Sequence, residues 1–370
     1  EVALGRRRLA YDELLMLQLG VALKRYQLRD TQRAPALRSS DAVHRAILGS
    51  FPYELTAAQS RVVDELTRDL TRDIPTNRLV QGDVGSGKTL VALYAMLLAV
   101  ESGHQAALMA PTEILAEQHF ESIQRTLGDG TRRVALLTGS VTPADRAVLL
   151  RRLRDGEIDL LIGTHALLTD GVDFKSLAVA VIDEQHRFGV HQRSKLRAKG
   201  AAGETGQQLT PHVIVMTATP IPRTMSLTLF GDLDVSTIDQ LPPGRQPIKT
   251  TIASPDDRAA VYQRVRDSVD EGDQVYVVVP TIDGDEETGL VGTRALVREL
   301  ESGALEGLRV ASVHGQLKRP TREHVMERFR RGLIDVLVAT TVIEVGVDVP
   351  NATGMVIEQA DRFGLAQLHQ

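Results

Sequence analysis

The sequence has no cysteine and no tryptophan, and aromatic residues make up only 4% of its 370 residues. The absence of cysteine excludes disulfides, thiol nucleophiles and zinc held by thiolates, and it favours a reducing compartment. Long apolar runs are also missing, because the longest, at residues 90–100, is far short of the ~20 residues that cross a bilayer. Residues 1–6 carry neither a signal peptide nor a methionine, so we expect a piece of a longer chain with no membrane partner.

An excess of positive charge is lacking as well. Lys and Arg number 43 against 48 Asp and Glu, which gives a formal net charge of −5. This balance argues against binding a polyanion over the whole surface, and it leaves local phosphate contacts within a cleft open. The length exceeds what one ordinary hydrophobic core supports, so about two domains of a soluble globular protein are expected.

The strongest motif is a glycine-rich loop at residues 82–89, which reads G-x-x-x-x-G-K-T between an apolar strand and an apolar helix. A turn that only joins strand to helix is the plain alternative, but this setting predicts a phosphate-binding loop with inward N–H groups at a helix N-terminus. Lys88 is expected to reach the β- and γ-phosphates, and the Thr89 hydroxyl to hold Mg²⁺. The predicted loop residues are Gly82, Gly85, Ser86, Gly87, Lys88 and Thr89.

A glutamine precedes this loop in the sequence. Thr56 is a candidate N-cap for a helix that runs to about Leu70, and Gln59 lies in its first turn. The amide of Gln59 has both a donor and an acceptor, so it can pair with the edge of an adenine. A glutamine near a helix start is more often simply exposed.

Two acidic residues follow a fully apolar strand at residues 179–182. Carboxylates beyond the carboxyl end of a parallel strand lie where α/β proteins bind their ligands. We expect Asp183 to hold Mg²⁺ through its water shell and Glu184 to orient and deprotonate an attacking water. An ordinary acidic turn is the alternative.

Polar residues beside these acids are candidates for coupling the site to a second domain. Residues 217–220 read T-A-T-P after the next strand, and a capped turn explains them equally well. The predicted coupling residues are Gln185, His186, Thr217 and Thr219.

Small hydroxyl-bearing and backbone donors also follow several other strands. Such groups can contact nucleic-acid phosphates without base preference, although each is more often a helix cap. Their repetition at strand ends predicts a phosphate-tracking rim, and Asp348 could face the nucleotide across a cleft. The rim residues are Pro111, Thr112, Thr138, Gly139, Thr164, His165, Thr340 and Thr341.

Short apolar runs alternate with helical stretches, which predicts an α/β fold with parallel sheets covered on both faces. A helix is expected from Asp12 to Leu23, held between partners because apolar residues occupy more than one of its faces. A strand is expected at 248–252. The predicted organisation is an N-terminal helical region at 1–50, a first domain at 51–230, a linker at 231–247 and a second domain, without a phosphate loop, at 248–370.

These pieces together resemble superfamily 2 helicases and translocases, which contain two tandem RecA-like domains of the P-loop NTPase type. The stretches at 109–119, 183–190 and 217–224 are similar both to the RecG family and to the transcription-repair coupling factor. The stretches that resemble RecG specifically are Gln185, 231–236, 241–245 and the opening 9–15.

The resemblance implies a bacterial, ATP-dependent double-stranded DNA translocase. Such a protein acts on stalled forks and Holliday junctions in recombination and repair, with ATP and Mg²⁺ as cofactors. It implies a monomer in the nucleoid-associated cytoplasm and single-stranded-DNA-binding protein as a further partner. It assigns the nucleotide roles above to Gln59, Lys88, Thr89, Asp183 and Glu184, and adds His314 to the DNA contacts. The alternatives are a transcription-repair coupling translocase and a P-loop kinase or signalling NTPase.

Two departures from the RecG pattern lead to a further expectation. The wedge domain should precede Glu1, and the arginine-rich motif should follow residues 366–370, so the second domain is expected to be incomplete at its C-terminus. Loss of an arginine finger costs roughly 10³–10⁵ in rate. This fragment is therefore expected to bind ATP but to hydrolyse it poorly.

Overall fold

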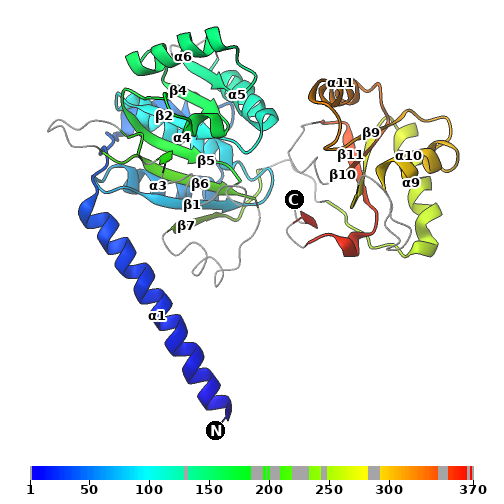
Figure 1. The fold of residues 1–370 in the computed structure, drawn as a ribbon, viewed down its shortest axis with the longest axis horizontal. Helices are drawn as coiled ribbons and strands as arrows, with labels where there is room; N and C mark the ends of the chain where they lie inside the picture. The colour runs from blue at the N-terminus through cyan, green and yellow to red at the C-terminus, as the bar shows by residue number, and fades with distance from the viewer. Residues whose placement is uncertain are drawn as a thin grey trace. The chain divides into compact units, whose positions relative to one another are not determined.

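The computed structural model divides into two compact units, Glu1–Arg245 and Gln246–Gln370, both visible in Figure 1. The residues that it describes are 2–128, 132–184, 195–196, 198–200, 209–218, 233–242, 248–281, 292–340, 349–364 and 367–368. Each unit contains its own parallel sheet, which confirms the predicted α/β class with two RecA-like domains.

The first unit is built on a seven-stranded sheet in the order β3-β4-β2-β5-β6-β1-β7 (Figure 1). Every neighbouring pair in this sheet is parallel. All of the strand ends that carry predicted site residues therefore face one edge. The strands are β1 (Asn77–Gly82), β2 (Gln105–Met109), β3 (Val134–Leu137), β4 (Leu160–Gly163), β5 (Leu177–Ile182), β6 (His212–Thr217) and β7 (Asp234–Ile238).

Helices cover both faces of this sheet. The described helices of the first unit are α1 (Val2–Thr31), α2 (Asp41–Leu48), α3 (Ala57–Leu70), α4 (Lys88–Glu101), α5 (Glu113–Leu127), α6 (Pro143–Asp155) and the 3₁₀ turn η1 (His165–Leu168). One hydrophobic cluster joins alternate strand residues to α2, α3, α4 and α5, and a second joins the intervening residues to α6 and η1. The two clusters follow from the period-2 alternation of side chains along each strand.

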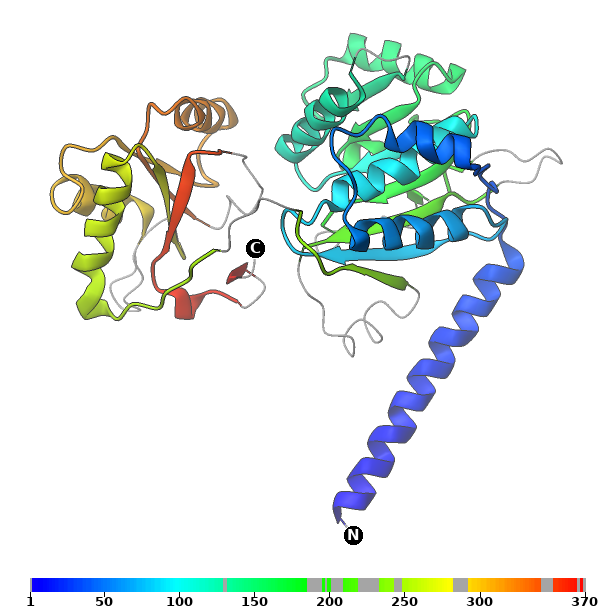
Figure 2. The same ribbon diagram turned by 180° about the vertical axis from the view of Figure 1, so that it is seen from behind.

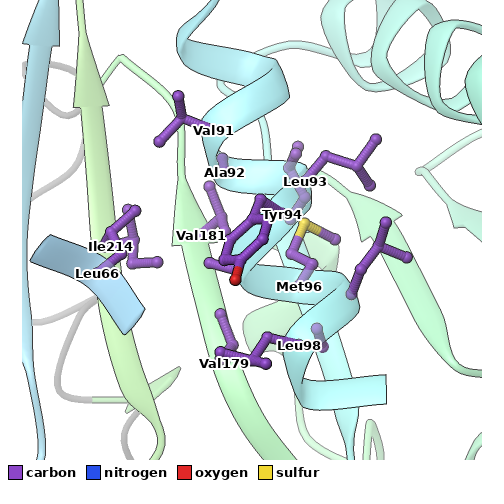
Figure 3. Close-up of a cluster of buried hydrophobic side chains, with 14 of the residues drawn as sticks. Leu66, Val91, Ala92, Leu93, Tyr94, Met96, Leu98, Val179, Val181 and Ile214 are labelled. Carbon is purple, nitrogen blue, oxygen red and sulfur yellow. The ribbon is translucent and has the colours of Figure 1, made fainter. Parts of the chain in front are cut away.

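The helix that follows the phosphate loop is the centre of this core. Figure 3 shows Tyr94 and Met96 of α4 in one buried cluster with Leu66 of α3 and the strand residues Val181 and Ile214. All five side chains are almost completely buried. The core therefore fixes α4, and with it the position of the loop at its N-terminus.

Part of the predicted linker belongs to the first sheet. Residues 234–238 form β7, which pairs with β1 at the edge of the sheet. Of the two buried positions of this strand, Ile238 is apolar, but the central one is Ser236, which accepts a bond from Arg78 Nη1 at 2.8 Å. A polar inward residue hides the alternation that identifies a strand, while the remaining domain boundaries stay a prediction.

The first helix differs from its prediction. The helix does not begin at Asp12, which lies inside α1, where its carboxylate accepts a bond from Arg8 Nε at 3.1 Å. The expectation that the helix is held between partners is wrong within the described residues, because large apolar side chains along it are exposed. These are Leu9, Tyr11, Leu14, Leu15, Met16, Leu17, Leu19, Leu23 and Tyr26.

The segment at residues 32–40, between α1 and α2, packs across the side of the first unit that is seen in Figure 2. The Ala34 amide donates to Asp73 O, and Leu37 is buried against α3 and α4. Burial lowers the pKa of His212, at the start of β6, to about 4. Its Nδ1 accepts a bond from the Thr76 amide at 3.2 Å, so its Nε2 carries the proton and donates to Pro35 O at 2.9 Å.

The second unit contains a four-stranded parallel sheet in the order β11-β8-β10-β9. Its elements are η3 (Pro255–Asp257), α9 (Arg258–Asp270), β8 (Gln274–Val279), α10 (Thr293–Glu301), β9 (Val310–Val313), α11 (Arg319–Arg330), β10 (Val336–Thr340), β11 (Ala352–Ile357) and η5 (Ala360–Arg362). Buried clusters join α9 and α10 to one face and α11 to the other. The strand expected at 248–252 is wrong, because Ile248 and Ile252 are exposed and lie outside any strand.

Each unit contains a buried glutamine that makes the same pattern of hydrogen bonds within that unit. In the first, Gln105 Nε2 at the start of β2 donates to Leu153 O and Ile158 O. In the second, Gln274 Nε2 at the start of β8 donates to Phe329 O at 2.7 Å and to the Ile334 carbonyl at 2.6 Å.

An ion pair is duplicated in the same way. Arg133 binds Asp159 before β3 and β4, and Arg309 binds Asp335 before β9 and β10. The strand order β9-β10-β8-β11 repeats β3-β4-β2-β5. Among the described residues, the four strands of the second unit therefore correspond to β3, β4, β2 and β5 of the first unit, and β6, β1 and β7 have no counterpart there. Among the described residues of both units, no helix is long and apolar enough to cross a membrane.

Candidate nucleotide site and nucleic-acid rim

The predicted phosphate loop and the two predicted acids lie at the carboxyl ends of β1 and β5, which together with the end of β6 we call the nucleotide half of the sheet edge. The phosphate loop follows β1, and Asp183 and Glu184 follow β5. Between them, β6 ends at Thr217, which pairs with Gln81. Because these strands are parallel neighbours, the sheet brings together motifs that are far apart in the sequence.

The phosphate loop has the backbone geometry of an anion cradle. Gly85 and Gly87 adopt φ values of 75° and 84°, which glycine reaches without steric cost. Helix α4 begins directly afterwards at Lys88, so its first amides point into the loop. The Lys88 ammonium donates to Gly82 O at 2.8 Å and to Asp83 O at 2.9 Å, which holds it at the loop.

Gln59 braces this loop from α3. It forms the predicted cap with Thr56, whose amide donates to Gln59 Oε1 at 2.8 Å. Its Nε2 donates to Ser86 O at 2.8 Å. These bonds leave one N–H and one lone pair of the amide for an adenine edge, so the adenine contact stays a prediction. A Cβ at Gly87 would lie 2.2 Å from Gln59 Nε2, so a side chain at this position would require the Gln59 amide to move.

The two acidic residues are held in distinct ways. The Asp183 carboxylate is buried; its Oδ1 accepts the Glu184 amide at 3.1 Å, and its Oδ2 lies 2.7 Å from His119 Nε2. Glu184 adopts φ 48°, and its Oε1 accepts the Ala218 amide at 3.3 Å. The first acid is therefore held by α5, and the second by the amide of Ala218, directly after β6.

The chemistry of these groups fits a magnesium-bound nucleoside triphosphate. The Ser86 hydroxyl is buried beside the loop and has no hydrogen-bond partner in the described part of the chain. The Thr89 hydroxyl and the Asp183 carboxylate are oxygen ligands of the kind that Mg²⁺ prefers. No group of three or more His, Asp or Glu side chains in that same part could hold a metal alone. A magnesium ion held by one or two protein oxygens completes its octahedral shell with water and phosphate oxygens.

The predicted rim of the first unit lies at the ends of β2, β3 and β4, which we call the rim half of the sheet edge. Thr112 caps α5 by accepting the Leu115 amide, and Thr164 caps η1 by accepting the Ala166 amide. Each bond uses a lone pair of the hydroxyl oxygen, so the O–H is still a donor for a phosphate.

Exposure separates the rim residues into two groups. Gly139 and His165 are exposed, and Pro111 and Thr112 are half-buried. Thr138 and Thr164 are buried in the first unit, as are His314 and Thr340 in the second. His314 directly follows β9 and Thr340 ends the neighbouring strand β10, and Thr340 Oγ1 is buried without a hydrogen-bond partner in the described ranges. The roles of all eight in nucleic-acid binding stay predictions.

Several predicted site residues cannot be placed. Gln185, His186, Thr219, Thr341 and Asp348 lie outside the described residues. The coupling that was predicted through them therefore stays a prediction, and only Thr217 of that group has a position, buried at the end of β6.

The sequence reasoning missed three contacts. It did not assign His119 a partner, did not place the Ala218 amide beside Glu184, and did not foresee that Glu113 Oε1 accepts the Gly139 amide at 2.8 Å. Each contact joins segments that only the sheet order brings together. The sequence did indicate that His119 and Glu113 share the helix that follows β2, which places both near the carboxyl edge of the sheet, but it did not indicate their partners.

Family comparisons agree with this geometry. The DEAD/DEAH box helicase family model matches residues 56–227, and the model of the Helicase conserved C-terminal domain matches residues 258–370. The first match covers the whole nucleotide half, and the second covers most of the second unit. A phosphate loop with two acids on one RecA-like domain, followed by a second such domain, is the core of a helicase.

Curated relatives define the family within that class. The chain is 48% identical over its full length to the ATP-dependent DNA helicase RecG of Synechocystis sp., covering 44% of that protein, and 46% identical to RecG of Aquifex aeolicus, covering 45% of it. The structure of RecG bound to a three-way DNA junction aligns with 99% of this chain and 47% of its own, with a TM-score of 0.80 and 40% identity. The chain belongs to the RecG family, and it spans about half the length of the curated relatives it matches.

Proposed function

We propose that the protein containing this chain is an ATP-dependent translocase on branched double-stranded DNA. The supporting observation is the division of one sheet edge into a nucleotide half at β5, β6 and β1 and a rim half at β3, β4 and β2. Coupling of ATP hydrolysis to movement along DNA is favoured when the nucleotide site and DNA contacts lie on one rigid element, and a single sheet provides this. The family relatives named as ATP-dependent DNA helicases support the same assignment.

Nucleotide binding is assigned to the phosphate loop. The loop amides and the α4 N-terminus bind the phosphates, and the Lys88 ammonium moves from its two loop carbonyls to the β- and γ-phosphate oxygens. Thr89 and Asp183 would hold Mg²⁺, which would supply positive charge beside the phosphates. Gln59 contacts the adenine while it keeps the loop in shape.

Hydrolysis is assigned to Glu184. Its Oε1 is fixed by the Ala218 amide, so its other oxygen is the one to orient water and take its proton. The left-handed backbone at Glu184 directs this side chain towards the end of β6 rather than along β5. The state of the γ-phosphate can thus be transmitted to the turn after β6, where Thr217 begins the predicted coupling segment.

Contacts with the DNA phosphates are assigned to the rim half and to the matching strand ends of the second unit. Hydroxyl and amide donors bind phosphates without reading bases, which suits movement along a duplex. Because RecG has been solved on a three-way junction, we propose forks and Holliday junctions as the substrates. We further propose that the protein works as a monomer in the bacterial nucleoid and contacts single-stranded-DNA-binding protein there.

Steady-state ATPase of the full-length protein tests this proposal, with no DNA, linear duplex or forked duplex. Forked DNA should stimulate turnover most. Lys88→Ala should weaken nucleotide binding about 10–100-fold, because it removes charge-assisted bonds. Glu184→Gln should keep nucleotide binding and slow turnover about 10²–10⁴-fold. Lys175→Ala, at an exposed lysine on the same unit, is the matched control.

Absence of any stimulation by DNA would overturn the motor assignment. Equal stimulation by linear and forked duplex would overturn the assignment to branched DNA. Normal turnover in Glu184→Gln would show that the general base lies elsewhere.

A further inference from the structure

The two halves of the first unit's sheet edge meet between β2 and β5. These strands are parallel neighbours, and Met109 at the end of β2 pairs with Ile182 at the end of β5. The Asp183 amide continues this ladder by donating to Met109 O at 2.9 Å. The acid assigned to magnesium is therefore the residue of the nucleotide half that directly adjoins the rim half.

A histidine crosses this boundary. His119 lies on α5, the helix that follows β2, and its Nε2 is 2.7 Å from Asp183 Oδ2. Both side chains are nearly buried, with 12% and 11% of their surface exposed. An ionised carboxylate can only accept, so the proton of this bond lies on Nε2 and the imidazole is the donor.

This bond fixes the plane of the carboxylate. Asp183 Oδ1 is already held by the Glu184 amide at 3.1 Å, and His119 holds the other oxygen. Each oxygen retains a second lone-pair direction for a metal ion or a water in its shell. With both oxygens bonded from the protein side, the remaining directions are fixed before any ion arrives.

The other end of α5 belongs to the rim half. Thr112 caps the helix, and the first helical residue, Glu113, accepts the Gly139 amide at 2.8 Å. His119 follows in the same helix. A displacement of the α5 N-terminus at the rim would therefore be carried by a rigid element to the Asp183 carboxylate.

We propose that His119 is a positioning residue for the magnesium carboxylate Asp183, and that α5 links the nucleic-acid rim to the metal through it. This proposal rests on the proposed function, because it requires Asp183 to serve magnesium. Outer partners of metal ligands act by orienting them, and their loss typically costs about 10–100-fold in metal affinity.

The test measures binding rather than turnover. The full-length protein is titrated with Mg²⁺ in the presence of a fluorescent, non-hydrolysable ATP analogue and without DNA. His119→Ala should raise the half-saturating Mg²⁺ concentration about 10–100-fold and leave the Mg²⁺-free affinity for the analogue unchanged. His119→Gln, which restores an N–H donor, should return the Mg²⁺ dependence towards that of the unchanged protein.

Two further variants separate the outcomes. Asp183→Asn should lose the Mg²⁺ dependence, whereas His104→Ala should keep it. His104 is a matched control because its Nδ1 lies 2.6 Å from Ser176 Oγ in the same unit, with a different partner and element.

Unchanged Mg²⁺ dependence in His119→Ala, together with its loss in Asp183→Asn, would overturn the role of His119 and leave the proposed function standing. Unchanged dependence in Asp183→Asn would overturn the metal assignment itself. Equal losses of affinity with and without Mg²⁺ in both His119 variants would show that the histidine only supports the fold, which also overturns the proposal.

Discussion

Among single residues, Gly87 carries the tightest steric constraint in the phosphate loop. Its φ of 84° favours glycine, and a Cβ would lie 2.2 Å from the Gln59 amide nitrogen that braces the loop. Gly103 has the same φ of 84°, but nothing lies within 4 Å of a Cβ built there. The chain thus contains a natural comparison between backbone strain alone and strain combined with a clash.

Gly87→Ala and Gly103→Ala should therefore have similar effects on stability but different effects on nucleotide binding. Both changes should lower the free energy of unfolding by about 1–2 kcal/mol through the left-handed backbone. Only Gly87→Ala should also weaken nucleotide binding, because it displaces Gln59 from the Ser86 carbonyl. Urea unfolding and titration with a fluorescent nucleotide check the two effects, and equal nucleotide affinities in the two variants would contradict the role assigned to the brace.

At this scale the sequence predicts what depends on local spacing. The spacing from Gly82 to Lys88 and the acids after an apolar strand are enough to predict Lys88 and Asp183 as site residues. The contact of His119 with Asp183 could not be predicted in this way, because it depends on β2 and β5 being neighbours. The left-handed backbone of Glu184 also has no local signature, since glutamate rarely adopts it.

Among the elements, β6 is joined to the segment at residues 32–40 by a buried, neutral histidine, His212. His212 accepts the Thr76 amide through Nδ1, and protonation of that nitrogen would break the bond. Burial lowers its pKa from the ordinary 6.5 to about 4. Because the unfolded chain takes up the proton first as the pH falls, this group contributes stability above pH 6.5 that is lost as the pH falls towards 4.

We expect the free energy of unfolding to fall by about 3 kcal/mol across that window through His212. His212→Gln should flatten this dependence, since an amide can accept from Thr76 and donate to Pro35 without titrating. Urea unfolding followed by circular dichroism at pH 7 and near pH 4 measures it, with the exposed His324→Gln as the control. An identical pH dependence in both variants would contradict the assignment to His212.

The elements also show where sequence patterns mislead. Apolar runs identified the central strands because both faces of those strands are buried, as in β5. They missed β7, whose inward Ser236 is polar, and they wrongly indicated a strand at 248–252, where Ile252 is fully exposed. Alternation reports which side chains can be buried, but a strand also requires a partner strand.

At the scale of the whole molecule, the duplicated glutamine brace leads us to expect that each unit is stabilised from within and unfolds independently of the other. Gln105 and Gln274 each satisfy two carbonyls within their own unit. Replacing either by Met removes the donor and takes this bond from two carbonyls, and each buried carbonyl left unsatisfied costs about 1–3 kcal/mol.

Gln105→Met should therefore destabilise the first unit and Gln274→Met the second, each with little effect on the other. Hydrogen exchange followed by mass spectrometry should show faster exchange in β2 and β4 for the first variant and in β8 and β10 for the second. Gln263→Met, at an exposed glutamine of α9, should change neither. Faster exchange in both units from one variant would show that they unfold together.

The common strand order gives the carboxylate at the end of β11 a particular meaning. Glu358 stands where Asp183 stands in the first unit, and its amide donates to Val278 O just as the Asp183 amide donates to Met109 O. Its carboxylate, however, accepts Arg258 Nε at 2.9 Å and the Tyr262 hydroxyl at 2.6 Å. The same position at the strand end therefore serves two different ends: the acid proposed for magnesium in the first unit is replaced in the second by an acid that is already paired with a cation of the chain itself.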